Sequence, residues 1–279
     1  DHNKYAWHQN LTDRNFLAIA AFEANIDQYP KPGQERPYLP VYHFNFYDKY
    51  PQNRPCKDEI RMPERRYDDI QYLNEYIQKM NEKGFLVCYN HPYWSLQNYQ
   101  DYINLKGLWA MEIYNNGCEI LGHYGYNPQV YDEMLRAGKR IYSVAADDNH
   151  NVNGFESPYC DSLGGFVWIK ADKLEYGAVM EALEKGSFYF SMGPEIKEVF
   201  VQGKMLKIKT SPVKKIYVIQ KGRNCYYKIA PKGKEITEAE FNLTGKEGYI
   251  RIVVRDAEGL EAGTNAYWLD TFWKNEVME

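Results

Sequence analysis

The sequence has no large excess of one charge and no long apolar run. Its 279 residues carry 34 Lys and Arg against 38 Asp and Glu, a net charge of −4, so overall electrostatics does not make it a polyanion-binding protein. Apolar runs before residue 200, such as residues 85–89, fall far short of the roughly 20 residues that cross a bilayer. We therefore expect no membrane partner. Ordinary proportions of hydrophobic (44%) and charged (26%) residues exclude disordered and collagen-like chains.

Cysteine is scarce and scattered, and no CxxC pair occurs. This excludes a zinc ribbon and a dense disulfide framework, and it favours reduced thiols in the cytoplasm. The five cysteines are Cys56, Cys88, Cys118, Cys160 and Cys225. The chain begins at Asp1 without a signal-peptide pattern, which indicates a processed protein, a trimmed chain or a fragment.

Several enzyme motifs are also missing. There is no Walker A loop and no G-x-S-x-G elbow, and Gly164-Gly165 is a turn before a strand, not a dinucleotide fingerprint. Arg61, Arg65 and Arg66 either grip a phosphate or lie solvated next to the acidic pair that follows. These absences direct attention to histidine and carboxylate chemistry.

Strands and helices alternate up to about residue 193. Apolar residues recur at helical spacing in residues 68–83, 129–137 and 171–185, and each segment is followed by a glycine that caps the helix. Short apolar runs between them predict strands at residues 85–89, 108–114, 140–146, 164–170 and 187–191. Repeated βα units predict a doubly wound sheet or a barrel, with the chemistry at the carboxyl ends of the strands.

The pattern changes at Gly193-Pro194. From residue 196 the sequence predicts seven short strands separated by turn signals, as in an all-β sandwich. We therefore predict two domains, a catalytic domain at residues 1–195 and a β-sandwich domain at residues 196–279. Residues 197–234 hold eleven Lys and Arg and one acid, either a solvated surface or a patch that meets an anionic substrate or polymer.

Six histidines are present, and several follow predicted strands beside carboxylates. In Asp148-Asn149-His150 the first and third residues project to one side of an extended segment and can bind metal, although a polar loop would explain the same residues. His91, in Asn90-His91-Pro92, ends a strand and is either a ligand or a satisfied loop histidine. We leave His8 and His123 out of the metal set because they have no carboxylate at ligand-like spacing.

Three further residues are ambiguous in isolation. His43 lies within a β-type run and by itself fits a core histidine. Glu23 ends an apolar run, where a buried carboxylate needs a cation or a metal beside it, although an exposed strand end would not. Asp1-His2-Asn3 alone would be dismissed as a frayed terminus.

Together, these pieces resemble the polymerase and histidinol phosphatase (PHP) superfamily of metal-dependent phosphoesterases. The ordered matching pieces are Asp1-His2-Asn3, Phe22-Glu23, His43, Asn90-His91-Pro92 and Asp148-Asn149-His150. Residues 186–195 are similar to the end of the catalytic domain in the branch that carries a small C-terminal β-domain. The resemblance implies an α/β fold, a distorted (β/α)7 barrel that is incomplete at its N-terminus, plus a small C-terminal all-β sandwich.

The resemblance also implies two to three divalent metal ions, Mn, Fe or Zn. By position, Glu23 would bridge two metals, His43 and His91 would complete one site, and His2 and His150 would serve another. Asp148 would serve the site shared with the first motif. The metal set is thus His2, Glu23, His43, His91, Asp148 and His150, with Glu23, Asp148 and His150 as the catalytic residues. Imidazole and carboxylate ligands suit these metals, and clustered metals activate water for attack on phosphorus.

The sequence departs from the family in one respect. The family opens with an H-x-H motif on its first strand, and no H-x-H occurs here. We therefore expect that the chain lacks the first βα segment. If that loss is real, the barrel has an open seam and hydrolysis is weak or absent; if the segment exists in the natural protein, we expect an ordinary enzyme of the family. The predicted function is a metal-dependent phosphoesterase acting on a small phosphorylated metabolite, nucleotide or short oligonucleotide, and not on a long nucleic acid. The alternatives are an impaired binding module with a partial metal site, or a hydrolase of a non-phosphate ester or amide.

Overall fold

The computed structural model describes residues 1–54 and 60–271. Cys56 and the last residues of the predicted second domain, 272–279, lie outside the described residues. No helix in the described ranges combines the length and the apolar character needed to cross a bilayer.

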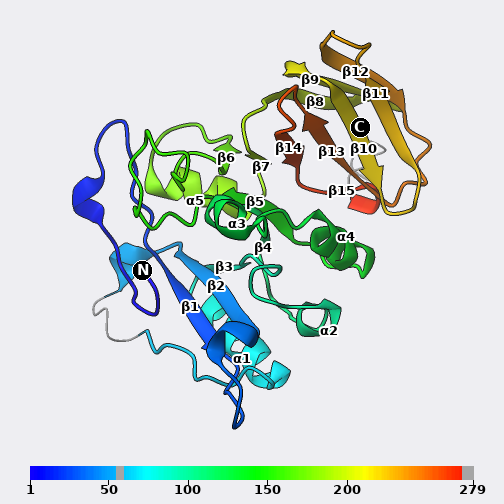
Figure 1. The fold of residues 1–279 in the computed structure, drawn as a ribbon. Helices are drawn as coiled ribbons and strands as arrows, with labels where there is room; N and C mark the ends of the chain where they lie inside the picture. The colour runs from blue at the N-terminus through cyan, green and yellow to red at the C-terminus, as the bar shows by residue number, and fades with distance from the viewer. Residues whose placement is uncertain (55–59, 272–279) are drawn as a thin grey trace.

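A five-stranded mixed sheet, here called the N-terminal sheet, forms the first half of the structure (Figure 1). In spatial order its strands are β1 (Ala21–Asp27), β2 (Val41–Asp48), β3 (Phe85–Tyr89), β4 (Ala110–Asn115) and β5 (Tyr142–Ala146). β2 is antiparallel to both β1 and β3, whereas β3, β4 and β5 are parallel. The carboxyl ends of β1, β3, β4 and β5 and the amino end of β2 therefore share one edge.

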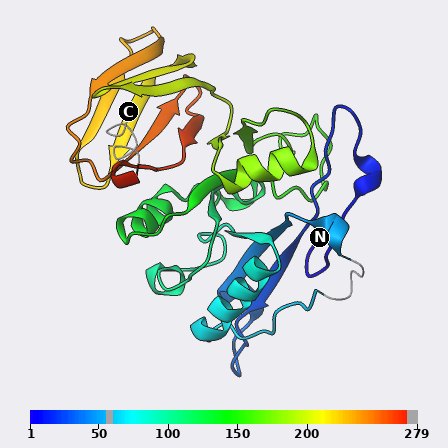
Figure 2. The ribbon, with the colours of Figure 1, turned by 180° about the vertical axis from the view of Figure 1, so that it is seen from behind.

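Apolar layers cover both faces of this sheet. On one face, α1 (Ile70–Glu82) buries Leu73, Ile77 and Met80 against the phenylalanines of β1 and β2, and it lies along these strands in Figure 2. On the other face, α5 (Tyr176–Glu184) packs against β3, β4 and β5. The remaining helices are α2 (Tyr99–Tyr102), α3 (Asn116–Gly122) and α4 (Pro128–Arg136), and short 3₁₀ turns occur at Gln9–Leu11, Arg36–Tyr38 and Pro51–Asn53.

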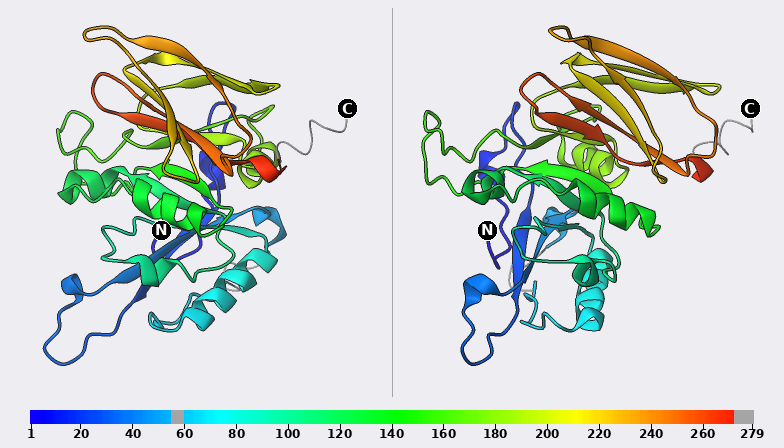
Figure 3. Two further views of the ribbon diagram at one scale, coloured as in Figure 1. Left: turned by 90° about the vertical axis from the view of Figure 1, so that its right-hand side faces the viewer. Right: turned by 45° about the vertical axis from the view of Figure 1, so that its right-hand side comes forward.

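Two further sheets enclose a separate apolar core, and in both views of Figure 3 they lie over the helices of the first half. The seven-stranded sheet comprises β11 (Cys225–Ile229), β10 (Lys215–Gln220), β13 (Tyr249–Arg255), β14 (Glu261–Thr264), β7 (Phe188–Ser191) and β6 (Phe166–Ile169), with β15 (Tyr267–Trp268) also paired to β13. The three-stranded sheet comprises β12 (Ile236–Asn242), β9 (Met205–Val213) and β8 (Ile196–Gln202). The seven-stranded sheet thus combines strands from before and after residue 195.

The predicted (β/α)7 barrel is wrong. In residues 1–54 and 60–271 no sheet closes into a barrel, and β1 and β5 are the edges of the N-terminal sheet. β6 and β7, expected to continue the barrel, pair antiparallel and join β14. Alternating strands and helices do not decide closure, which depends on strand tilt and stagger. In addition, residues 28–40 connect β1 to β2 without an α-helix, so these two strands form an antiparallel pair.

The glycine after α5 shows how helix ends are fixed. Gly186 has φ +72°, and a Cβ there would lie 2.4 Å from the ring of Tyr142, which packs in the core beneath α5. Gly138, after α4, has φ +89°, and no described atom lies within 4 Å of the corresponding Cβ position. Gly138 is therefore required by the left-handed backbone alone, whereas Gly186 is required by both the left-handed backbone and the close Tyr142 ring.

We expect Gly186→Ala to lower the free energy of unfolding by about 2–3 kcal/mol and Gly138→Ala by about 1 kcal/mol. Both alanines carry the left-handed backbone penalty, but only Ala at position 186 must also displace a packed aromatic ring. Urea unfolding of the two variants beside the wild type measures the difference. Equal losses would show that the Tyr142 ring moves aside freely.

Candidate metal centre

Candidate ligands meet at the shared edge of the N-terminal sheet because neighbouring strands begin or end there. Glu23 lies in β1 and His43 in the amino half of β2, where it faces Asn25 in the strand register. His91 is the second residue after β3, and Asp148 is the second residue after β5. His2 reaches the same place because the N-terminal segment forms a parallel bridge to Glu23.

The Glu23 carboxylate is the centre of this group. Its Oε2 lies 3.1 Å from Nδ1 of His2, and its Oε1 lies 3.1 Å from Nδ1 of His43 and 3.5 Å from Nε2 of His91. The side-chain amide of Asn90 donates to Oε1 over 2.9 Å. One ligand atom from each of His2, Glu23 and His43 lies within 4.8 Å of the others, a spacing that can surround one ion.

His91, Asp148 and His150 extend the group along the sheet edge. Nε2 of His91 lies 3.9 Å from Oδ2 of Asp148. The rings of His2 and His150 have centroids 6.2 Å apart, but Nδ1 of His150 lies 2.7 Å from the backbone carbonyl oxygen of Asp148. His150 is therefore beside the group without being turned wholly toward its centre.

Burial and charge are balanced at the centre. Burial alone would raise the pKa of Glu23, but the imidazoles of His43 and His91 lower it well below its ordinary value. Burial opposes charge on His91 too, but Glu23, Glu112 and Asp148 raise its pKa above the ordinary value. A pair of this kind keeps the carboxylate ionised inside the protein, which a cation ligand requires.

Glu112 is a buried acid that the sequence interpretation missed. It lies in β4, is 2% exposed, and its Oε2 accepts hydrogen bonds from the backbone nitrogen of His91 (3.1 Å) and the side-chain amide of Asn115 (3.0 Å). Burial raises the pKa of Glu112 to about 7, although His91 and Asn115 act to lower it. The signal was the same as for Glu23, since a lone acid interrupts the apolar run of a buried strand.

Two of the candidate ligands have unusual backbone conformations. His91 has φ +24° and Asp148 has φ +49°, and neither is glycine. The Glu112 carboxylate holds the backbone of His91, and Asn115 donates to both Glu112 and Asp148, over 3.3 Å to the latter. Strained non-glycine residues persist where the surroundings fix them, and they concentrate at functional sites.

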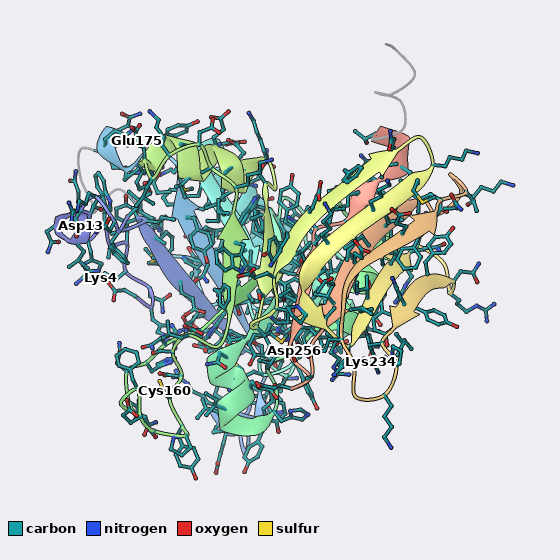
Figure 4. All side chains as sticks on the ribbon, turned by 90° about the horizontal axis from the view of Figure 1, so that it is seen from above. Lys4, Asp13, Cys160, Glu175, Lys234 and Asp256 are labelled. Atoms are coloured by element: carbon teal, nitrogen blue, oxygen red, sulfur yellow. The ribbon has the colours of Figure 1, made fainter. Side chains whose placement is uncertain are left out.

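The two histidines left out of the metal set and the three arginines have other partners. His8 faces Asp1 at 3.6 Å, and the exposed His123 is hydrogen-bonded to Glu119. The three arginines of the predicted phosphate cluster, Arg61, Arg65 and Arg66, each face an acid, which are Glu64, Asp27 and Asp69 in that order. In the C-terminal half, four lysines of the basic segment each face an acid, namely Lys197, Lys207, Lys209 and Lys214. Lys234 of the same segment, labelled in Figure 4, is exposed.

Family models, curated proteins and solved structures were all compared with the chain, and none of them matches it. The site is therefore interpreted from its own geometry.

Proposed function

We propose that the chain is a metal-dependent hydrolase of the PHP type that cleaves phosphoesters by metal-activated water. The observation that carries the proposal is the convergence of His2, Glu23, His43, His91 and Asp148, from five separate segments, on one edge of the N-terminal sheet. Imidazole and carboxylate ligands in this combination favour Zn, Mn or Fe.

The residues present fit a metal ion. Nδ1 of His43 is buried and has no hydrogen-bond partner among the described atoms, although Oε1 of Glu23 lies 3.1 Å away. An unpartnered buried polar atom is costly, and a cation between Glu23 and His43 would satisfy it. His2, Glu23 and His43 would hold one ion, and His91, Asp148 and His150 would complete the remaining positions.

Each side chain has a defined part in this proposal. When bound, divalent metal supplies Lewis-acid stabilisation of a phosphoryl oxygen and makes water more acidic. Asn90 orients the Glu23 carboxylate through its hydrogen bond, and Glu112 fixes the backbone of His91. The exposed His150 imidazole has Nδ1 2.7 Å from the backbone carbonyl oxygen of Asp148, and the His150 backbone nitrogen donates to the Asp161 carboxylate over 2.7 Å, so these contacts hold His150 beside the other candidate ligands.

The first test is hydrolysis of p-nitrophenyl phosphate with added Mn²⁺. We expect turnover that rises with Mn²⁺ and falls at least about tenfold in Asp148→Ala. The matched control is Asp270→Ala, which should keep the wild-type rate. Asp270 is an exposed aspartate near the C-terminal end of the described residues, and it pairs with Arg140. No turnover of p-nitrophenyl phosphate or of the phosphodiester bis(p-nitrophenyl) phosphate at any metal concentration would contradict the proposal and favour the binding module with a partial metal site.

A second candidate is hydrolysis of a non-phosphate ester or amide. The low positive charge beside the centre favours this candidate, because a phosphate group is anionic and a carboxylic ester or amide is not. Arg36 is the single Lys or Arg among the described residues that line the adjoining cavity. Aryl carboxylic esters tested next to the phosphate separate the two candidates.

We also propose a reducing, cytoplasmic location. Cys88, Cys118, Cys160 and Cys225 are free thiols in the described part of the chain, which supports this proposal.

A further inference from the structure

A cavity of about 1130 Å³ opens directly beside the candidate metal centre. Five of the six predicted ligands line it, namely His2, His43, His91, Asp148 and His150. The volume slightly exceeds the range of about 300–1,000 Å³ that is usual for small-molecule sites. The cavity therefore has room for a substrate much larger than its reacting group.

The walls of this cavity are largely apolar and come from the segments that follow β3, β4 and β5 at the same sheet edge. Six large apolar side chains both line the cavity and are at least 39% exposed: Trp94, Leu96, Leu121, Tyr124, Val152 and Tyr159. Leu121 and Val152 are 76% and 78% exposed. Apolar side chains gathered around a concave site mark a surface that a ligand covers, whereas scattered ones need no explanation.

Trp94 is the part of the cavity wall that lies next to the candidate metal ligands. Its ring centroid lies 5.1 Å from that of His91 and 5.7 Å from that of His43. The apolar wall and the ligands are therefore continuous, so that a group bonded to the reacting atom would pass directly onto apolar surface.

The charges that line the cavity also favour a substrate whose non-reacting part is uncharged. Asp148 and Asp161 line the cavity without a Lys or Arg partner among the described residues, whereas Asp27, also in the lining, pairs with Arg65. Arg36 is the one permanently cationic side chain among the described lining residues. A second anionic group on the substrate, away from the reacting centre, would face carboxylates without enough cations to balance them. An uncharged group suits these walls.

We propose that the substrate is an ester whose second, non-reacting substituent is large, uncharged and apolar, such as an aryl group, and that this substituent occupies the cavity. For the phosphoester chemistry of the proposed function, on which this inference rests, the substrate is then a monoanionic phosphodiester with an apolar arm. Trp94, Leu121 and Val152 determine the preference.

The binding test compares diphenyl phosphate with dimethyl phosphate, which have the same charge and the same phosphodiester centre. We expect isothermal titration calorimetry on the purified protein to give at least about tenfold tighter binding of diphenyl phosphate, because one methylene in an apolar pocket already changes discrimination by roughly 10–200-fold. Leu121→Ser and Val152→Ser should each reduce this preference at least about threefold. The matched control is Leu174→Ser, since Leu174 is 50% exposed and lies outside the cavity lining.

Equal affinity for the two phosphates, or a preference unchanged in both cavity variants, would overturn the inference. Hydrolysis separates this failure from failure of the proposed function. Bis(p-nitrophenyl) phosphate and methyl p-nitrophenyl phosphate have the same leaving group and charge, and we expect at least tenfold higher kcat/KM for the first with Mn²⁺. Equal kcat/KM values would overturn the apolar preference while supporting the hydrolase. Preferential binding of diphenyl phosphate with no hydrolysis of either ester would reject the hydrolase alone.

Discussion

Replacement of Glu23 by glutamine should remove bound transition metal from the protein and abolish hydrolysis. Oε1 and Oε2 of Glu23 face His43, His91 and His2, so one carboxylate serves every imidazole at the centre. Glutamine has the same shape but no charge. Because loss of an outer partner of a metal ligand already weakens metal binding roughly 10–100-fold, loss of the central carboxylate should weaken it at least about 100-fold.

Elemental analysis of protein purified without chelator, followed by titration with Mn²⁺, measures this effect. Glu240→Gln is the control, because Glu240 is an exposed glutamate of β12 that pairs with Lys207 far from the site. The control should keep the wild-type metal content. Wild-type protein free of Mn, Fe and Zn, or a Glu23→Gln variant with unchanged metal content, would reject the metal centre.

Asp132→Ala is expected to lower the free energy of unfolding by about 3–5 kcal/mol. Arg251 of β13 is 1% exposed, and its guanidinium donates two hydrogen bonds to the Asp132 carboxylate of α4, over 2.9 and 3.0 Å. Alanine at position 132 would leave a buried cation without its carboxylate. The pair joins the helices of the first half to the seven-stranded sheet, so its loss should destabilise both halves.

A double variant distinguishes the lost pair from lost packing. Arg251→Met with Asp132→Ala removes both charges, and it should recover most of the stability that Asp132→Ala loses. Arg255→Met in the same strand is the control, because Arg255 is 47% exposed beside Glu261 and should change stability by about 0–1 kcal/mol. Urea unfolding of all four proteins gives the comparison. A small loss in Asp132→Ala would show that water or another group replaces the carboxylate.

Local features of the fold followed from the sequence. The helical spacing of Leu73, Ile77 and Met80 matches the buried face of α1, and the predicted strand at residues 85–89 has the bounds of β3. Long-range features did not follow. The pairing of β7 with β14, distant in the chain, removes β7 from any barrel, and no local pattern in either strand encodes that partner.

In the candidate site, too, some residues were predicted from the sequence and others were not. Residue type alone left Glu23, His43 and His91 ambiguous, and the order of the motifs with the family that this order resembles brought them into one hypothesis. In the structure these side chains are neighbours. The hydrogen bond that Glu112 accepts from the backbone of His91 was not predicted. Glu112 acts through the backbone of His91, and such a contact depends on how the chain turns after β3, which a spacing pattern does not contain.

The pairing of β7 with β14 has a consequence for any attempt to isolate the half of the chain that carries the candidate ligands. A chain shortened to residues 1–195 would keep all six candidate ligands but would strip β7 of its neighbour and leave the Asp132 carboxylate without Arg251. The orphaned strand edge would then be free to recruit other molecules. The shortened chain would thus hold every candidate ligand and still be prone to aggregate, because the residues that cover β7 lie far away in the sequence.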